Sequence, residues 1–276
     1  MSSEIKVDTI SENTSANGVA IDSLGIKDGK ITNLMNATLS AADLGTGIHI
    51  KTADSSGDVS TSADNLVIED SGDSGMTILG GTSNHSRINF GDSGDNDIGQ
   101  ITYDHGANAM NIKTNASGSL YITADGEITK ARQPMASARP TNAVTNITGD
   151  GTLAYLGNSI GATERFDVGG CFSNDGMLFI APVTGKYLLC GQLIFSGLAS
   201  NHTLSYFMLS TSNQSYYPFY GAELDTVGYL GSFGSAFSVI ADMDANDSAQ
   251  LAMQVYGGSK VVDASTSTFL TGMLLA

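Results

Sequence analysis

Short apolar segments separated by polar turns follow one another along the first half of the chain. Each apolar segment is about four residues long, and most alternate apolar with polar side chains, as in 48–51, 66–69 and 110–113. Turns rich in Asp, Gly, Ser and Asn separate them at roughly ten-residue spacing. Because a two-residue alternation puts every second side chain on one face, the pattern predicts short β-strands.

The apolar segments after residue 140 are longer and more aromatic. Turn residues still separate them, and long stretches with helical spacing are missing. About 130 residues with this pattern favour a β-sandwich or jelly roll. The expected strands cover 177–181, 185–195, 202–209, 235–241, 248–256 and 268–275.

Composition divides the chain into four segments. Residues 1–33 form a short module of strands and tight turns, and residues 34–130 form a repetitive β-rich shaft. Residues 131–142, with two prolines, are predicted to be a neck, and residues 143–276 form the head. Inside the shaft, the spacing in 34–46 favours one short helix. The predicted fold class is therefore all-β, an elongated stalk followed by a jelly-roll head.

The shaft is not expected to fold as a single chain. A four-residue strand with two inward apolar side chains buries too little surface to be stable alone. Regular repetition of such strands indicates stacking along or around an axis. The sequence therefore predicts an oligomer.

The head resembles the complement one-q/tumour necrosis factor type of jelly roll over residues 160–276. The resemblance lies in Phe166-Asp167, in Phe172 and in the run 176–187, which follows the family's "G-x-F-x-A-P-x-x-G-x-Y" pattern with one extra residue before Phe179. The run 267–275 is similar to the final "S-x-F-x-G-x-L-L" strand, with one extra residue before Gly272. The resemblance implies a homotrimer, and it implies that Phe179 and Tyr187 face the sandwich core.

The first half is similar to bacteriophage tail fibres and other virion fibres. The similarity lies in 5–10 and 18–29 for the N-terminus, and in 88–105 with Met110 for the shaft. It implies that residues 1–33 attach to other virion proteins of the tail or baseplate. It also implies that the shaft is trimeric and that the head binds a host surface receptor or polysaccharide.

Net charge excludes several partners. The chain has 12 Lys and Arg against 28 Asp and Glu, a net charge of −16. Such an acidic chain is a poor ligand for nucleic acid or for an anionic membrane, since Lys and Arg supply that affinity. The N-terminus has no apolar signal-peptide core, and no run reaches the roughly 20 apolar residues of a membrane span. We therefore expect synthesis in the host cytoplasm, no membrane insertion, and a final place in the virion.

Catalytic and metal-binding motifs are missing from the sequence. The four histidines match no Ser/His/Asp or HExxH pattern, although His85 and His105 could line a trimer axis. The acidic run 242–247 lacks the Gly and terminal Glu of an EF-hand, so an acidic turn is favoured over a calcium loop. Glu223 and Asp225 are the best-spaced pair for glycoside hydrolysis. We predict no enzyme activity, no cofactor and no metal.

Aromatic residues in the middle of the head are the candidate contacts with the host. A tyrosine offers a flat apolar face and a hydroxyl, which suits sugar or protein contact. Packing of such a cluster in the core or a trimer interface is the alternative, and the pattern favours it slightly. Tyr206 and Phe207 belong to the same region. The candidates are Tyr216, Tyr217, Phe219, Tyr220 and Tyr229.

Cys171 and Cys190 match no zinc pattern, and two buried thiols are favoured over one disulfide.

The function predicted from the sequence is a homotrimeric structural fibre subunit of a bacteriophage virion with a host-binding head. A cellular complement-like binding module is the alternative. A glycan-cleaving tailspike is a third reading.

Overall fold

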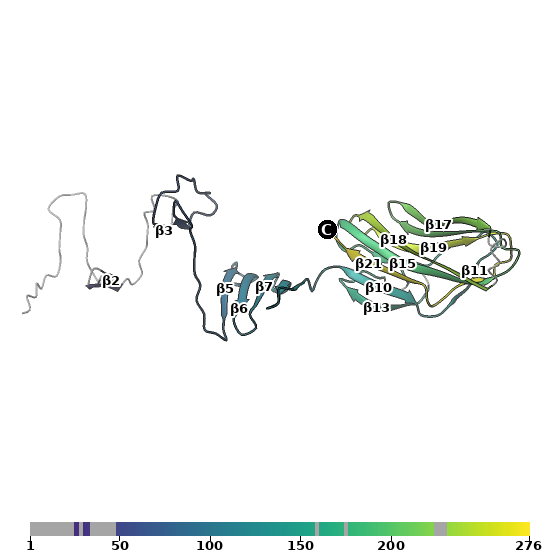
Figure 1. Ribbon diagram of the computed structural model, residues 1–276, viewed down its shortest axis with the longest axis horizontal. Coiled ribbons are helices and arrows are strands. Elements are labelled where there is room, and N and C mark those ends of the chain that lie inside the picture. Colours follow the sequence, from purple (N-terminus) through teal and green to yellow (C-terminus); the bar gives the residue numbers. More distant parts are fainter. Residues whose placement is uncertain (1–24, 28–29, 34–47, 158–159, 174–175, 224–230) are drawn as a thin grey trace, which may run out of the picture. The chain divides into compact units, whose positions relative to one another are not determined.

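The computed structural model describes residues 25–27, 30–33, 48–157, 160–173, 176–223 and 231–276 (Figure 1). All regular elements in these ranges are β-strands, and none of these residues is helical. The all-β prediction is therefore confirmed for the described residues. The short helix expected in 34–46 and most of the attachment segment 1–33 lie outside them.

The chain divides into two compact units, Met1–Ile78 and Leu79–Ala276. The first contains the antiparallel pair β1 (Gly25–Lys27) and β2 (Lys30–Asn33). It also contains the parallel pair β3 (Ile48–Lys51) and β4 (Leu66–Glu69). The unit boundary at residue 78 lies inside the segment that the sequence assigned to the shaft.

The second unit begins with a five-stranded antiparallel sheet, here called the meander. Its strands follow chain order, because each turn returns the chain beside the strand it has just left. Asn108, Asn115 and Ala116 have positive φ in the turns that join the third strand to its neighbours. The strands are β5 (His85–Phe90), β6 (Gly99–Asp104), β7 (Ala109–Thr114), β8 (Ser117–Ile122) and β9 (Ile128–Thr129).

The remaining strands form two sheets, here called the sandwich. The order in the first sheet is β11-β20-β15-β21-β10-β13, with β18 on the free side of β15. Its strands are β10 (Met135–Pro140), β11 (Val144–Thr148), β13 (Ala162–Val168), β15 (Gly185–Leu198), β18 (Gly231–Met243), β20 (Val262–Ala264) and β21 (Phe269–Leu274).

The second sheet has the order β12-β19-β16-β17, with β14 also paired to β19. From β15 onward the chain crosses repeatedly between the sheets, because β16 and β17 lie in the second, β18 in the first, β19 in the second and β21 in the first. Figure 1 shows the two layers. This is the arrangement of a jelly roll, as expected for the head. The strands are β12 (Leu153–Tyr155), β14 (Phe179–Ile180), β16 (Leu204–Thr211), β17 (Ser215–Glu223) and β19 (Ser248–Val255).

The sandwich begins at Met135, so the segment 131–142 is not only a neck. β10 occupies half of it and pairs with β13 on one side and β21 on the other. Its residues Met-Ala-Ser-Ala-Arg-Pro carry little apolar signal, and Ala136 and Ala138 are buried only because distant strands cover them. A pattern read along the chain does not contain that information.

Aromatic rings fill the core beside the strand-turn-strand motif. Phe179 and Tyr187 are fully buried, as the family resemblance implied, with ring centroids 5.6 Å apart in an edge-to-face arrangement. Phe172 contacts Phe179 at 5.7 Å. The Tyr187 hydroxyl donates to the Val183 carbonyl at 2.8 Å, which satisfies its one polar group.

Asp167 explains the Phe-Asp pair of the motif. Its carboxylate accepts hydrogen bonds from the backbone N–H groups of Cys171 and Phe172, at 2.8 and 3.0 Å. The tight turn between Asp167 and Cys171 contains Gly169 and Gly170, both with positive φ. The carboxylate therefore holds the turn that delivers Phe172 to the core.

Gly272 gives a direct test of this packing. A Cβ at Gly272 would lie 2.5 Å from the buried Phe179 ring. We expect Gly272→Ala to lower the free energy of unfolding by about 1–3 kcal/mol, since overpacking a closed core strains it. Chemical denaturation measures the change. Gly161→Ala is the control, because its Cβ would have no neighbour nearer than 3.8 Å, and equal effects of the two changes would contradict this account of the core.

Candidate functional site

The structure separates the aromatic candidates by face. Tyr217 and Tyr220 on β17 point outward and are 51% and 72% exposed. Tyr216 and Phe219 on the same strand are partly buried and pack against the core. Tyr229 lies outside the described residues. The pairing of β16 with β17 shifts between Phe207 and Leu209, which pair with Phe219 and Tyr216, so β17 has one extra residue there. This bulge puts Tyr217 and Tyr220 on one face and Tyr216 and Phe219 on the other.

Strand register completes an aromatic surface around these two tyrosines. Tyr220 pairs with Tyr206 on β16, Tyr206 pairs with Gln254 on β19, and Gln254 pairs with Leu153 on β12. One row of side chains thus crosses four strands on the outer face of the second sheet. We call this surface the aromatic face. Its lining residues are Leu153, Tyr155, Tyr206, Met208, Ser215, Tyr217, Tyr220, Gln254 and Tyr256.

The aromatic face encloses a shallow hollow of about 370 Å³. Tyr206 makes edge-to-face contacts with Tyr220, at 4.9 Å between centroids, and with Tyr256, at 6.1 Å. Burial and then the adjacent Tyr220 raise the pKa of Tyr206, so its hydroxyl stays protonated at neutral pH. The lining contains no Asp, Glu, Lys, Arg or His side chain.

Tyr155 and Tyr256 are members of the aromatic face that the sequence did not indicate. Each stands outside the aromatic cluster in the sequence, and only the pairing of β12 and β19 with β16 brings them to it. Tyr155 is 48% exposed. No local signal in the sequence marks either residue, since lateral strand order is a long-range property.

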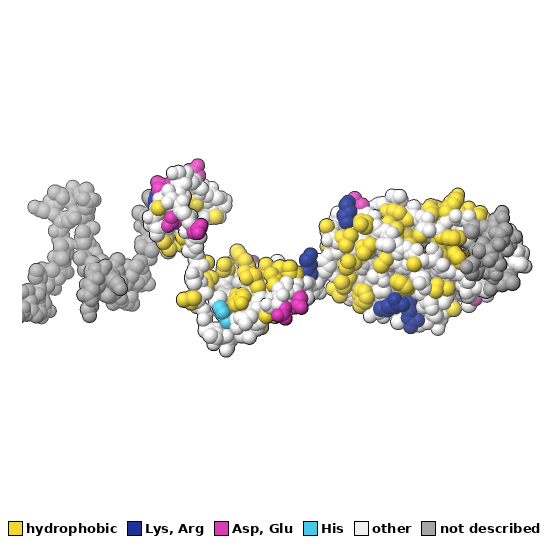
Figure 2. Space-filling model, viewed as in Figure 1, with side chains coloured by type: hydrophobic (Ala, Val, Ile, Leu, Met, Phe, Trp, Pro, Cys, Tyr) yellow, Lys and Arg dark blue, Asp and Glu magenta, His cyan; other side chains and the backbone are white. Residues whose placement is uncertain are grey.

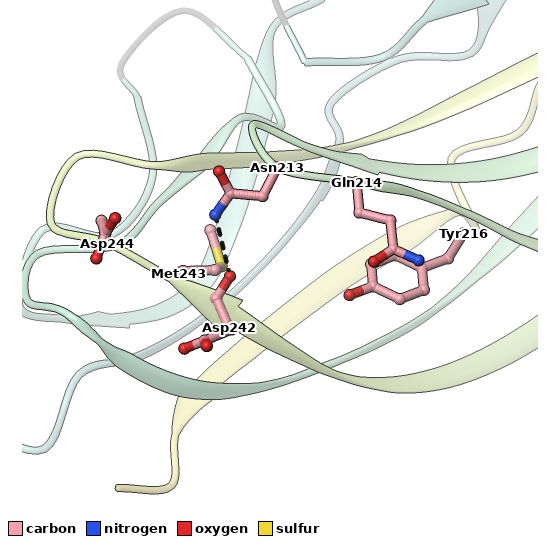
Figure 3. Close-up of a pocket in the computed structure, with 6 residues that line it drawn as sticks. All are labelled: Asn213, Gln214, Tyr216, Asp242, Met243 and Asp244. Carbon is pink, nitrogen blue, oxygen red and sulfur yellow. Dashed lines mark hydrogen bonds between the residues drawn. The ribbon is translucent and has the colours of Figure 1, made fainter.

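The acidic run 242–247 forms a turn whose carboxylates have partners within the protein. The Asp247 carboxylate accepts from the Asp244 backbone N–H at 2.9 Å and from Asn213 Nδ2 at 2.7 Å. Lys186 Nζ lies 2.7 Å from Asp242. Beside the turn is a hollow of about 300 Å³ lined by Asn213, Gln214, Tyr216, Asp242, Met243 and Asp244 (Figure 3). Within the described ranges, no three His, Cys, Asp or Glu side chains gather as a metal site would require.

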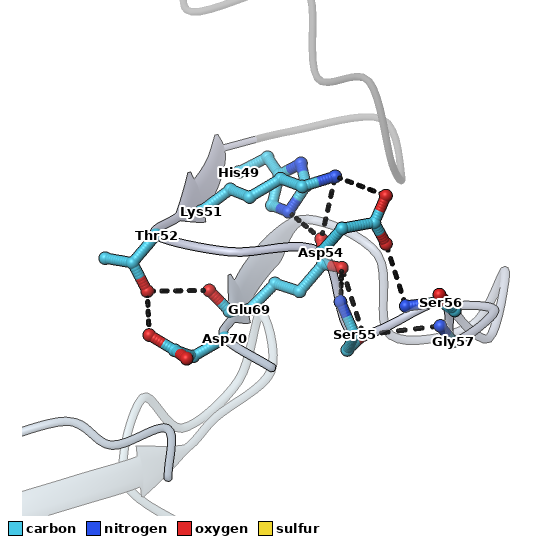
Figure 4. Close-up of polar contacts among 9 residues, drawn as sticks. All are labelled: His49, Lys51, Thr52, Asp54, Ser55, Ser56, Gly57, Glu69 and Asp70. Atoms are coloured by element: carbon cyan, nitrogen blue, oxygen red, sulfur yellow. Dashed lines mark hydrogen bonds and ion pairs between the residues drawn. The ribbon is translucent and has the colours of Figure 1, made fainter. Parts of the chain in front are cut away.

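A polar cluster joins the two strands of the β3–β4 pair (Figure 4). His49 Nε2 lies 2.8 Å from the Glu69 carboxylate, and both side chains are almost completely buried. The Ser55 backbone N–H and hydroxyl both donate to Glu69, at 2.7 and 3.0 Å. The Ser55 N–H holds the pKa of Glu69 below its ordinary value, with Lys51 adding to the effect. The cluster closes the loop between the strands.

The other histidines have local partners. His105 Nε2 lies 2.9 Å from the Ser86 hydroxyl, and His85 lies 3.6 Å from Asp104. His202 is buried and accepts the Ala199 backbone N–H through Nδ1. Of the carboxylate pair suggested for hydrolysis, Asp225 and the side chain of Glu223 lie outside the described residues.

The two cysteines are free thiols, as the sequence favoured. Cys171 is fully buried, and Cys190 is half-buried. Burial, strengthened by the neighbouring Asp167 carboxylate, raises the pKa of Cys171 to about 11. Burial also raises the pKa of Cys190.

No protein-family model and no curated protein sequence matches this chain. Among solved structures, murine APRIL at pH 8.5 aligns with 52% of this chain and 99% of its own, with 14% identity and a TM-score of 0.36. The globular domain of zebrafish complement 1qA protein aligns with 52% of this chain and 98% of its own, with 12% identity and a TM-score of 0.31. Eiger TNF from S. frugiperda aligns with 52% of this chain and 94% of its own, with 13% identity and a TM-score of 0.36. The jelly-roll assignment rests on the strand order above and not on these alignments.

No helix long and apolar enough to cross a bilayer occurs in the described part of the chain.

The raised pKa of Cys171 predicts an unreactive thiol. In a Cys190→Ala variant at pH 8, a thiol reagent should modify native Cys171 about two orders of magnitude more slowly than the unfolded chain, because only the thiolate reacts. Between the ordinary thiol pKa and about 11, the unfolded chain releases the Cys171 proton while the folded protein keeps it. The folded protein therefore loses stability as the pH rises through this range. Timed alkylation followed by mass spectrometry measures the rates. Similar rates in the two states would contradict the burial of this thiol.

The lowered pKa of Glu69 predicts acid sensitivity of the β3–β4 pair. The carboxylate stabilises this pair above the ordinary Glu pKa, and that contribution is lost as the pH falls through the lowered native value. Glu69→Gln should therefore increase hydrogen exchange in 48–69 at neutral pH and weaken its acid dependence. Asp58→Asn, at an exposed position, is the control. Unchanged exchange in Glu69→Gln would show that the cluster does not hold the loop.

Proposed function

We propose that this chain is a homotrimeric, non-enzymatic fibre subunit whose sandwich binds a target on a cell surface. The observation that carries the proposal is the distribution of apolar side chains on the meander. Hydrophobic side chains lie at the surface of this segment (Figure 2). The register places them together on one side of a single-layered sheet.

The apolar face of the meander follows directly from its strand pairs. Ile88 pairs with Ile101, Ile101 with Ile112, and Ile112 with Leu120. A second row contains Tyr103, Met110, Ile122 and Ile128. The opposite face carries Arg87, Asn89, Gln100, Thr102, Asn111 and Lys113. Tyr121, which pairs with Asn111, also lies on that face. A mainly apolar face opposite a mainly polar one is typical of a sheet with one buried face.

In a single chain, part of the apolar face of the meander has no cover and is exposed to solvent. Ile88, Met110 and Ile128 are 39%, 37% and 61% exposed. Contiguous exposed apolar surface of this kind marks an interaction site. Three copies arranged around an axis would bury the three apolar faces against one another, which supports a trimeric shaft.

The first sheet of the sandwich supports self-association as well. Its outer face carries Leu188, paired with Ile240 on β18 and with Met273 on β21. Ile240 is 60% exposed. The aromatic face lies on the other sheet and points away from this aliphatic surface. Trimer contacts through the aliphatic surface would therefore leave the aromatic face free for a ligand.

The virion role rests on the resemblance of 4–30 and 66–130 to phage fibres. The solved structures named above do not bear on it.

A cellular complement-like binding module is the second candidate, favoured by the jelly-roll strand order of the sandwich. Particles purified from an infected culture and probed with an antibody to residues 143–276 distinguish the two. Label on the virion supports the fibre, and label on uninfected cells supports the cellular module.

Ile128 and Thr129 provide a matched test of the trimer. They are adjacent on β9, both are exposed in one chain, and they lie on opposite faces. Light scattering should give about three chains per particle for the native protein and for Thr129→Asp. Ile128→Asp should shift the mass toward one chain, because it would bury a carboxylate at the axis. A stable monomer of the native protein would overturn the proposal.

A further inference from the structure

We propose that the aromatic face binds an uncharged saccharide, with Tyr155, Tyr217 and Tyr220 as its contact residues. This inference rests on the proposed binding function of the sandwich and specifies its ligand. Three properties of the aromatic face support it: the orientation of its rings, the lack of charge in its lining, and its place on the sheet opposite the aliphatic surface.

The rings are held in position before any ligand arrives. Tyr217 and Tyr220 meet at 83° with centroids 6.0 Å apart, and Tyr220 meets Tyr206 at 65°. Edge-to-face contacts of this kind restrict ring rotation and leave ring faces open to solvent. Tyr206 is half-buried and supports the more exposed Tyr220. A preorganised platform binds with a smaller loss of side-chain entropy.

The polar groups of the aromatic face match those of a sugar. Tyrosine hydroxyls and the Ser215 hydroxyl both donate and accept hydrogen bonds. The Gln254 amide is oriented by a 2.7 Å hydrogen bond from Nε2 to the Gly151 carbonyl. A pyranose ring presents C–H groups to the electron-rich ring faces and hydroxyls to these neutral groups. The hollow of about 370 Å³ lies within the usual range of ligand sites.

Charge distinguishes between classes of glycan. The lining contains no Lys, Arg, Asp or Glu, so it has no cationic partner for a carboxylate or sulfate. The chain as a whole carries a net charge of −16, which repels anionic polymers. An uncharged polysaccharide is therefore the ligand class that the surface fits.

The experiment uses the full-length chain and a set of immobilised polysaccharides. Dextran, a mannan and a galactan are the uncharged probes, and alginate and hyaluronate are the anionic ones. Because the chain contains no Trp, tyrosine fluorescence reports binding without interference. The native protein should bind at least one uncharged probe and neither anionic probe. Binding confined to the anionic probes, or to none of the five, would overturn the inference.

Variants locate the site. Tyr217→Ala with Tyr220→Ala should weaken binding roughly tenfold or more, whereas Tyr220→Phe should retain most of it because the ring face remains. Tyr121→Ala is the matched control, since Tyr121 is 38% exposed on the meander. Thermal unfolding checks that each variant is folded, and truncation of a side chain that is 72% exposed should be tolerated. Equal binding by the double variant and the native protein would place the saccharide elsewhere.

Cell binding and particle mass separate this inference from the proposed function. A double variant that loses saccharide binding but still binds cells as a trimer would restrict the failure to the ligand assignment, with a protein receptor as the partner. A native protein that is monomeric or binds no cell would reject the proposed function itself. Release of reducing sugar from a bound polysaccharide would show that the protein hydrolyses glycans, which would contradict the proposed non-enzymatic function.

Discussion

Alternate side chains of β15 fill the space between the two sheets, and the rest of the sandwich is arranged around them. Tyr187, Leu189, Leu193 and Phe195 point inward and are almost fully buried. Burial of each contributes about 1.5–3 kcal/mol of hydrophobic stabilisation. Because β15 pairs along most of its length with β18 on one side and with β20 and β21 on the other, the core and the order of the first sheet depend on the same strand.

The meander also has an apolar sheet face, but no second sheet of the same chain covers it within the described ranges. A sheet with one apolar face is stable only when that face is covered. In the sandwich, a second sheet of the same chain supplies the cover. The meander has a mainly apolar face whose residues Ile88, Met110 and Ile128 remain exposed in one chain. The meander therefore needs partner chains to cover its apolar face, whereas the sandwich covers its own core.

The two outer faces of the sandwich differ in the chemistry of their side chains. One sheet exposes aliphatic residues such as Ile240, which suit contact with another protein chain. The other exposes tyrosines, which suit a ligand that has both apolar and hydroxyl groups. The turns hold these faces through backbone contacts, as when Asp247 accepts the Asp244 N–H. Asp167 has the same structural role beside Cys171.

The sequence by itself determined the strand content and the apolar alternation, because these depend on residues close together in the chain. The burial of Phe179 and Tyr187 was expected only from the family resemblance, since partners distant in the chain cover them. It did not reveal β10 as a central strand, because Ala136 and Ala138 are buried by partners more than a hundred residues away. The sequence also placed Tyr216 and Phe219 among the same contact residues as Tyr217 and Tyr220, although the two pairs lie on opposite faces of β17. Only the tertiary structure brought Tyr155 and Tyr256 to the aromatic face, since lateral strand order arises from pairing between distant segments.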